Sequence, residues 1–164
     1  MLRDKSLIPL SHQHQRALAL CVRIDRAQPI PHADLPAWQD EIEMLFEQEI
    51  KIHFAAEEEL LFPAARQFAE LVSLVDELIV DHDALREFFA QAEARNLSAD
   101  DLPALAQQLS AHIRKEERQL FERMQHLMTS AELASLGLRL EAALRDAAQS
   151  CILTNEVTRL KAKK

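Results

Sequence analysis

Two stretches of the chain carry the same pattern of residues, and this pattern strongly constrains what the chain can fold into. "HFAAEEELLF" begins at His53 and "HIRKEERQLF" begins at His112. In both, two glutamates follow the histidine by four and five residues, and Leu-Phe follows it by eight and nine. Residues four apart lie on the same face of an α-helix. Each stretch therefore predicts a helix that carries a histidine, a carboxylate and large apolar side chains on one face.

The rest of the chain also has the composition and the periodicity of long helices. Alanine, leucine, glutamate, glutamine and arginine dominate, and only 1 of the 164 residues is glycine. These are good helix formers, and tight turns are few without glycine. Apolar residues recur at the helical period between prolines and capping residues. Five helices are expected, at about residues 7 or 11 to 28, 34 to 63, 68 to 94, 98 to 128 and 130 to 149.

Long helices joined by short loops predict an all-α fold. The expected architecture is an antiparallel up-down-up-down four-helix bundle, with an additional C-terminal helix across its outside or end. Residues 1–150 are expected to form this one domain, and residues 151–164, which end in "KAKK", a basic, solvated C-terminal tail. Candidate caps begin three of the helices: Asp34, Ser98, and Thr129 with Glu132.

Charge and hydropathy exclude two classes of partner. The net charge of -8 argues against nucleic acid. The chain shows neither the apolar run of a signal peptide nor about 18 consecutive apolar residues, so no membrane partner is expected and a cytoplasmic location is predicted. The two cysteines lie too far apart to suggest a disulfide framework, and Cys21 is expected to be a packed thiol.

The first helix offers two histidines, and periodicity chooses between them. His14 follows Leu10 by four residues and precedes Leu18 by four, so it lies on the apolar face. His12 shares its face with polar residues and is expected to point outward. Each of the first four helices then presents one inward histidine.

The inward polar residues together have the composition of a metal site. Burying carboxylates and imidazoles without a countercharge costs several kcal/mol per ion, a cost that bound cations would remove. Mixed imidazole and carboxylate ligands suit first-row transition metals. The set fits two metal ions, each with two histidines and both bridged by the glutamates; the alternative is an apolar bundle with scattered polar residues. The candidate ligands are His14, His53, Glu57, His82, His112 and Glu116.

This pattern resembles the hemerythrin-like (hemerythrin HHE cation-binding) domain family over about residues 7–128. The family signature is a histidine on the first helix, His-x-x-x-Glu on the second, a histidine on the third and His-x-x-x-Glu on the fourth; "SHQHQRAL", "HFAAEEELLFPA", "DHDALREFF" and "HIRKEERQLF" match it in turn. The resemblance implies a non-haem di-iron centre, two iron ions that can be oxo-bridged. It also implies interaction with oxygen, nitric oxide or peroxide, in sensing or in a redox or stress response.

One position departs from the oxygen-carrying members, which have a second histidine one turn after the helix-three histidine. Arg86 stands at that place. With one ligand missing, more coordination positions are open, which favours oxidation chemistry, sensing or looser metal occupancy over reversible oxygen carriage. An alternative is that Arg86 brings a positive charge near a bound anion.

Other carboxylates lie near the candidate ligands in sequence. Glu49 lies one turn before His53 on the apolar stripe and is a candidate for orienting a ligand imidazole. Four more face sideways by periodicity and are expected to be solvated surface residues: Glu58, Asp81, Asp83 and Glu117.

Three functions stay open: a di-iron protein that binds or senses a small oxidant, an iron storage or handling protein, and a metal-free helical interaction domain. Ferritin-type bundles are disfavoured because their metal helices carry Glu-x-x-His, the reverse order. No catalytic residues are predicted and the protein is not expected to be an enzyme, although weak oxidase or peroxide chemistry is compatible with the pattern. A sensor that consists of this single domain would have to signal through a protein partner.

Overall fold

The computed structural model describes residues 2–148 and 157–159, and helices are the only regular elements within these residues. The expected all-α class is therefore confirmed. The α-helices are α1 (Ile8–Ala27), α2 (Leu35–Leu45), α3 (Lys51–Ala56), α4 (Phe62–Ala65), α5 (Val72–Glu93), α6 (Asp101–Lys115), α7 (Phe121–Leu127) and α8 (Ser130–Ala148).

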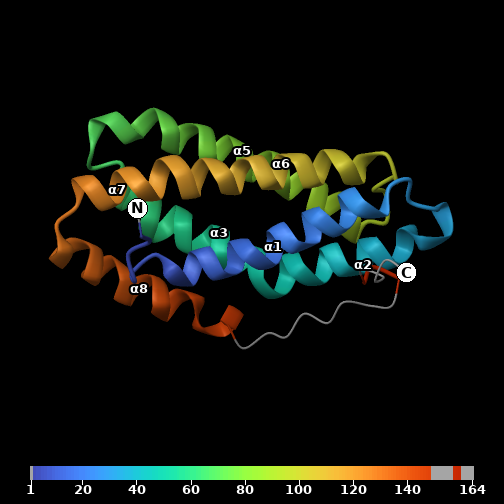
Figure 1. Cartoon of the computed structure of the whole chain (residues 1–164), viewed down its shortest axis with the longest axis horizontal. Coiled ribbons are helices and arrows are strands. Elements are labelled where there is room, and N and C mark those ends of the chain that lie inside the picture. Colours follow the sequence, from blue (N-terminus) through green and yellow to red (C-terminus); the bar gives the residue numbers. More distant parts are fainter. Residues whose placement is uncertain (1, 149–156, 160–164) are drawn as a thin grey trace.

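The long helical stretches lie side by side along the long axis of the molecule (Figure 1). The chain leaves the end marked N along α1, returns along α2 to α4, leaves again along α5 and returns along α6 and α7. Helix α1 packs against α6, and α2 packs against α5. Helix α8 lies outside these stretches, against α1 and α3. Within the described residues, no helix is both long enough and apolar enough to span a membrane.

The second long stretch (α2 to α4) and the fourth (α6 and α7) contain wide π turns that a uniform helical period does not predict. These turns cover Phe46–Ile50, Glu57–Leu61 and Glu116–Leu120. After each turn, the backbone N–H of the following residue donates to the carbonyl oxygen five residues earlier, as that of Phe62 does to Glu57. Single π turns inside α-helices are frequent at functional sites. Two of the three begin at the first glutamate of the repeated motif.

Two of the three predicted caps are present. The backbone N–H of Thr129 donates to the Glu132 carboxylate at 2.7 Å, and the Glu132 N–H donates to the Thr129 hydroxyl at 3.3 Å, as a capping box requires. The Asp101 N–H donates to the Ser98 hydroxyl at 3.3 Å. The prediction for Asp34 is wrong, because its side chain makes no capping bond. A 3-10 turn, His32–Asp34, runs directly into α2 there, and its backbone bond satisfies the Leu35 N–H.

A polar layer divides the core in two. One apolar cluster contains Trp38 and Phe89, and the other contains Phe62 and Phe121. Each long stretch contributes to both clusters, and its buried histidine or glutamate lies near the point where its contribution changes from one cluster to the other. On α5, for example, Leu78 belongs to one cluster, Leu85 to the other, and His82 is buried between them.

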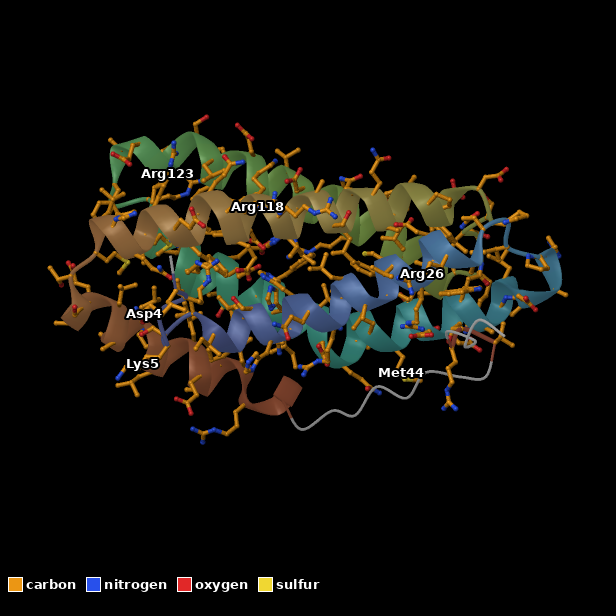
Figure 2. The ribbon with its side chains drawn as sticks, viewed as in Figure 1. Asp4, Lys5, Arg26, Met44, Arg118 and Arg123 are labelled. Atoms are coloured by element: carbon orange, nitrogen blue, oxygen red, sulfur yellow. The ribbon has the colours of Figure 1, made fainter. Side chains whose placement is uncertain are left out.

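The first residues of the chain are packed against the last helix. A side chain built at Gly137 on α8 would place its Cβ 2.6 Å from the Cβ of Ser6 and 2.8 Å from its Cα. Glycine is therefore required for this crossing. The neighbouring residues Asp4 and Lys5 also lie beside α8 (Figure 2).

The predicted C-terminal tail lies mostly outside the described residues. In its described part, residues 157–159, the Thr158 carbonyl accepts a hydrogen bond from Arg23 of α1 at 3.0 Å, and Thr158 is buried. This short part therefore contacts the helices.

Candidate metal centre

The structure brings all six predicted ligands together in the polar layer. Each of them is buried, with at most 4% of its surface exposed. His14 comes from α1, His53 from α3, His82 from α5 and His112 from α6. The two glutamates, Glu57 and Glu116, stand at the first positions of the π turns that follow α3 and α6. His12, by contrast, is exposed, in agreement with the predicted phase of the first helix.

The six residues form two four-residue sets that share both carboxylates. One set is His14, His53, Glu57 and Glu116, and the other is Glu57, His82, His112 and Glu116. Within each set the potential ligand atoms lie within 4.8 Å of one another.

The shared carboxylates face both pairs of histidines. Oε1 of Glu57 lies 3.1 Å from Nε2 of His53, and Oε2 lies 3.3 Å from Nε2 of His82. Oε2 of Glu116 lies 3.2 Å from Nε2 of His14 and 3.3 Å from Nε2 of His112. Each carboxylate therefore spans the two sets.

The donor atoms fit metal ions better than they fit one another. Among the described residues, all four oxygens of Glu57 and Glu116, and Nε2 of His82 and of His112, lack a hydrogen bond of good geometry. Buried polar atoms without partners are costly. Nε2 of His14 and Nε2 of His53 lie 3.0 Å apart. Two nitrogens about 2.1 Å from one ion at a right angle would be separated by about this distance. The residues present therefore fit a bound cation in each set.

The charges of the centre also call for cations. Burial opposes a positive charge on His14, but the neighbouring carboxylates of Glu116 and Glu117 outweigh burial and raise its pKa to about 10. Burial would raise the pKa of Glu57, yet the neighbouring His53 and His82 hold that pKa well below its usual range. Without metal, the carboxylates thus favour protonation of His14, and the pKa of His82 is raised in the same direction.

The outer nitrogens of the histidines are oriented by a second set of acceptors. Nδ1 of His14 lies 2.7 Å from Oε1 of Glu117, and Nδ1 of His82 lies 2.7 Å from Oε1 of Glu58. With Nδ1 donating to a carboxylate, the lone pair of Nε2 faces the centre, the usual arrangement around metal-bound histidine.

The prediction that Glu58 and Glu117 are solvated surface residues is therefore wrong. A sideways position on a packed helix faces the neighbouring helix rather than water. The fourth stretch packs against α1, which brings Glu117 to His14, and the second packs against α5, which brings Glu58 to His82.

Asp81 is partly buried beside a ligand histidine, whereas Asp83 is exposed to solvent. Asp81 is partly buried, and its carboxylate lies 3.6 Å from Nδ1 of His112 and 2.8 Å from the Lys115 ammonium, so the prediction of a solvated residue is wrong here too. Asp83 is 72% exposed, as predicted, and pairs with Arg86 at 3.3 Å.

His53, the remaining ligand histidine, is held by a residue that was not predicted from the sequence. Nδ1 of His53 lies 2.7 Å from the side-chain oxygen of Gln13, which is buried. Its position beside His14 on the first helix was the only signal available. Glu49, the predicted candidate for orienting an imidazole, is buried but pairs instead with Nε of Arg16 at 2.6 Å.

Arg86 lies beside the centre without joining either donor set. Its guanidinium donates to Oε1 of Glu58 at 2.7 Å and lies over the ring of Phe54, 5.5 Å from the ring centroid. The group that takes the place of the second helix-three histidine therefore contacts a carboxylate that holds a histidine.

A cavity of about 20 Å³ adjoins the centre. This is enough room for one water-sized molecule. Three of the six candidate ligands reach it, and most of the other lining side chains are apolar: the lining residues are Gln13, His14, Ala17, Glu49, Ile50, His53, Phe54, Leu109, His112 and Ile113.

A family model agrees with this arrangement. The model of the hemerythrin HHE cation binding domain matches residues 9–124, which include all six candidate ligands. No curated protein and no solved structure gives a significant match.

Proposed function

The chain belongs to the hemerythrin HHE cation-binding family, and from this premise we propose that it is a non-haem di-iron protein that interacts with oxygen, nitric oxide or peroxide. The observation that supports this proposal best is the pair of buried donor sets sharing Glu57 and Glu116. His14 and His53 would hold one iron ion, His82 and His112 would hold the other, and both donor sets would share Glu57 and Glu116. We also infer that the helices form the antiparallel up-down-up-down four-helix bundle of this family, with α8 as the additional helix.

The donor chemistry supports iron, because imidazole and carboxylate together suit first-row metals that change oxidation state. Two bound iron ions would supply the electrons that reduce a small oxidant. The chain's own residues hold the ligand protons outside the centre, at Nδ1. Glu58, Glu117 and Gln13 accept hydrogen bonds from Nδ1 of His82, His14 and His53, so Nε2 of each of these three histidines faces inward.

The cavity supports a diatomic or similarly small oxidant. Its volume of about 20 Å³ suits a molecule of this size, and its wall is mostly apolar. His14, His53 and His112 line it, so a molecule inside it would lie next to the proposed ions.

The count of ligands supports oxidation chemistry or sensing over oxygen carriage. Each donor set has four protein ligands, and the place of a further histidine is taken by Arg86, which is engaged with Glu58. Coordination positions therefore stay open at both ions. We propose that oxygen converts the reduced protein to a ferric state without a long-lived adduct.

Anaerobic loading with Fe²⁺, followed by elemental analysis, tests the metal content. About two iron ions per chain are expected, together with near-ultraviolet bands after exposure to air. A content near zero refutes the dinuclear proposal, and a content near one replaces it with a mononuclear site. Stopped-flow mixing of the reduced protein with oxygen then tests the chemistry, and a long-lived reversible adduct would place the protein among the oxygen carriers.

A further inference from the structure

Arg86 is connected to the ligand His82 by two separate routes. Glu58 accepts hydrogen bonds through the same oxygen, Oε1, from Arg86 at 2.7 Å and from Nδ1 of His82 at 2.7 Å. The guanidinium also lies over the ring of Phe54, and that ring stacks on His82 with centroids 3.7 Å apart and planes 15° apart. A carboxylate and an aromatic ring thus both link the arginine to one imidazole.

The same four residue types repeat this arrangement around His14. Glu117 lies 2.7 Å from Nδ1 of His14 through Oε1 and accepts from Arg3 at 2.6 Å through Oε2. Arg3 also donates to the Glu117 carbonyl at 2.6 Å and lies 4.9 Å from the ring centroid of Phe121. That ring is stacked on His14 at 5.7 Å with planes 14° apart.

The repetition separates these arginines from ordinary surface charges. An isolated exposed ion pair contributes about 0–1 kcal/mol and has no reason to recur with the same set of residue types. Here each guanidinium donates to the second glutamate of a Glu-Glu pair and lies over a phenylalanine ring. Both that glutamate and that ring contact one ligand histidine. Both carboxylates are only partly exposed, at 30% for Glu58 and 24% for Glu117, so their charge is screened incompletely.

We propose that Arg3 and Arg86 are positioning residues of the metal centre, each of which fixes one ligand histidine through a glutamate and a phenylalanine. This inference rests on the proposed metal site. Arg86 keeps Glu58 turned toward His82 instead of toward water, and Arg3 does the same for Glu117 and His14. The residue that replaces the second helix-three histidine thus supports an existing ligand.

The position of Arg3 adds a consequence for the architecture. Residues before α1 take part in the centre, because Arg3 bridges from the start of the chain to the π turn that holds Glu116 and Glu117. Each half of the centre therefore has its own arginine, one from the chain start and one from α5.

Titration with Co²⁺, followed by calorimetry and by the visible absorption of the bound ion, tests the inference without oxygen or iron. Arg86→Leu and Arg3→Leu are each expected to lower the affinity for one of two Co²⁺ ions by about tenfold, the lower end of what loss of an outer hydrogen-bond partner costs. The absorption of the affected ion should shift as its histidine reorients. Because the two arginines act on different histidines, the double variant should lose about a hundredfold in the product of the two affinities.

Three further measurements keep the outcome clear. Arg66→Leu removes an exposed arginine that pairs with Asp76, and it should leave Co²⁺ binding unchanged. Arg86→Lys keeps a charge beside Glu58 and should retain more affinity than Arg86→Leu. Circular dichroism of the metal-free variants should match the unmodified protein, since Arg86 is 37% exposed.

Two results would overturn the inference. One leaves the proposed metal site intact, and the other refutes that site as well. If the unmodified chain binds two Co²⁺ ions and both leucine variants bind them within twofold as tightly, the arginines do not position the ligands while the metal site stands. If the unmodified chain binds no Co²⁺, the proposed function falls and the inference falls with it.

Discussion

Removing the metal should make the stability of the protein fall steeply as the pH rises above neutrality. In the metal-free protein, burial opposes protonation of His14, but the neighbouring carboxylates of Glu116 and Glu117 prevail and raise its pKa from 6.5 to about 10. A group whose pKa is higher in the folded chain than in the unfolded chain stabilises the fold fully below the unfolded value. That contribution is lost as the pH rises from 6.5 through about 10.

The size of the loss follows from the same two values. At 1.36 kcal/mol for each tenfold change in proton affinity, the full contribution of His14 is on the order of 5 kcal/mol. About 2–3 kcal/mol of it should disappear between pH 7 and pH 9. The pKa of His82 is also raised, against its burial, by Glu57, so its effect has the same sign. Domains of this size have about 5–15 kcal/mol of stability in total, so the change should be plain.

Urea unfolding of the chelated and the metal-loaded protein, at intervals from pH 6 to pH 9.5, measures this effect. In the loaded protein a cation takes the place of the proton on His14, and binding improves with pH because the ligands must be deprotonated. The two pH profiles should therefore diverge. The variant Glu117→Gln should flatten the metal-free profile, since it removes one of the charges that raise the pKa. A metal-free stability that stays level or rises between pH 7 and pH 9 would refute the reasoning.

Three further predictions concern single side chains. His14→Ala should lower the metal content on elemental analysis, whereas His12→Ala, at an exposed position on the same helix, should leave it unchanged. Gly137→Ala should lower the free energy of unfolding by about 1–3 kcal/mol, because the new methyl would meet Ser6 at 2.6 Å; a stability equal to that of the unmodified protein would mean that α8 shifts freely. Thr129→Ala should cost about 1 kcal/mol in urea unfolding through loss of the capping box, and no change would show that the cap is not needed.

The inward ligands were predictable because they depend only on helical phase. His14, four residues after one buried leucine, could hardly point elsewhere on a regular helix, and the structure buries it. The all-α class followed in the same way from apolar periodicity and the scarcity of glycine. These features are local, and a single sequence carries local information well.

The outer contacts were not predictable, because they depend on which helices are neighbours. Whether Glu58 faces water or His82 is decided by the packing of the second stretch against α5, which no local pattern states. The π turn that begins at Glu57 also changes the helical phase at that point. Gln13 was missed for a similar reason, since its partner His53 lies 40 residues away.

The polar layer across the core also has a consequence for the order in which the chain assembles. The contact between His14 and Glu117 joins positions 103 residues apart, and closing so long a loop is an entropic cost that early folding steps avoid. No single helical hairpin contains either complete donor set, so a cation meets its full set of ligands only after both halves have docked. Docking without a cation would have to desolvate two carboxylates and four imidazoles against each other, which opposes that docking. Metal uptake during refolding would thus mark the end of the folding reaction, and a free cation would speed its last step without altering its first.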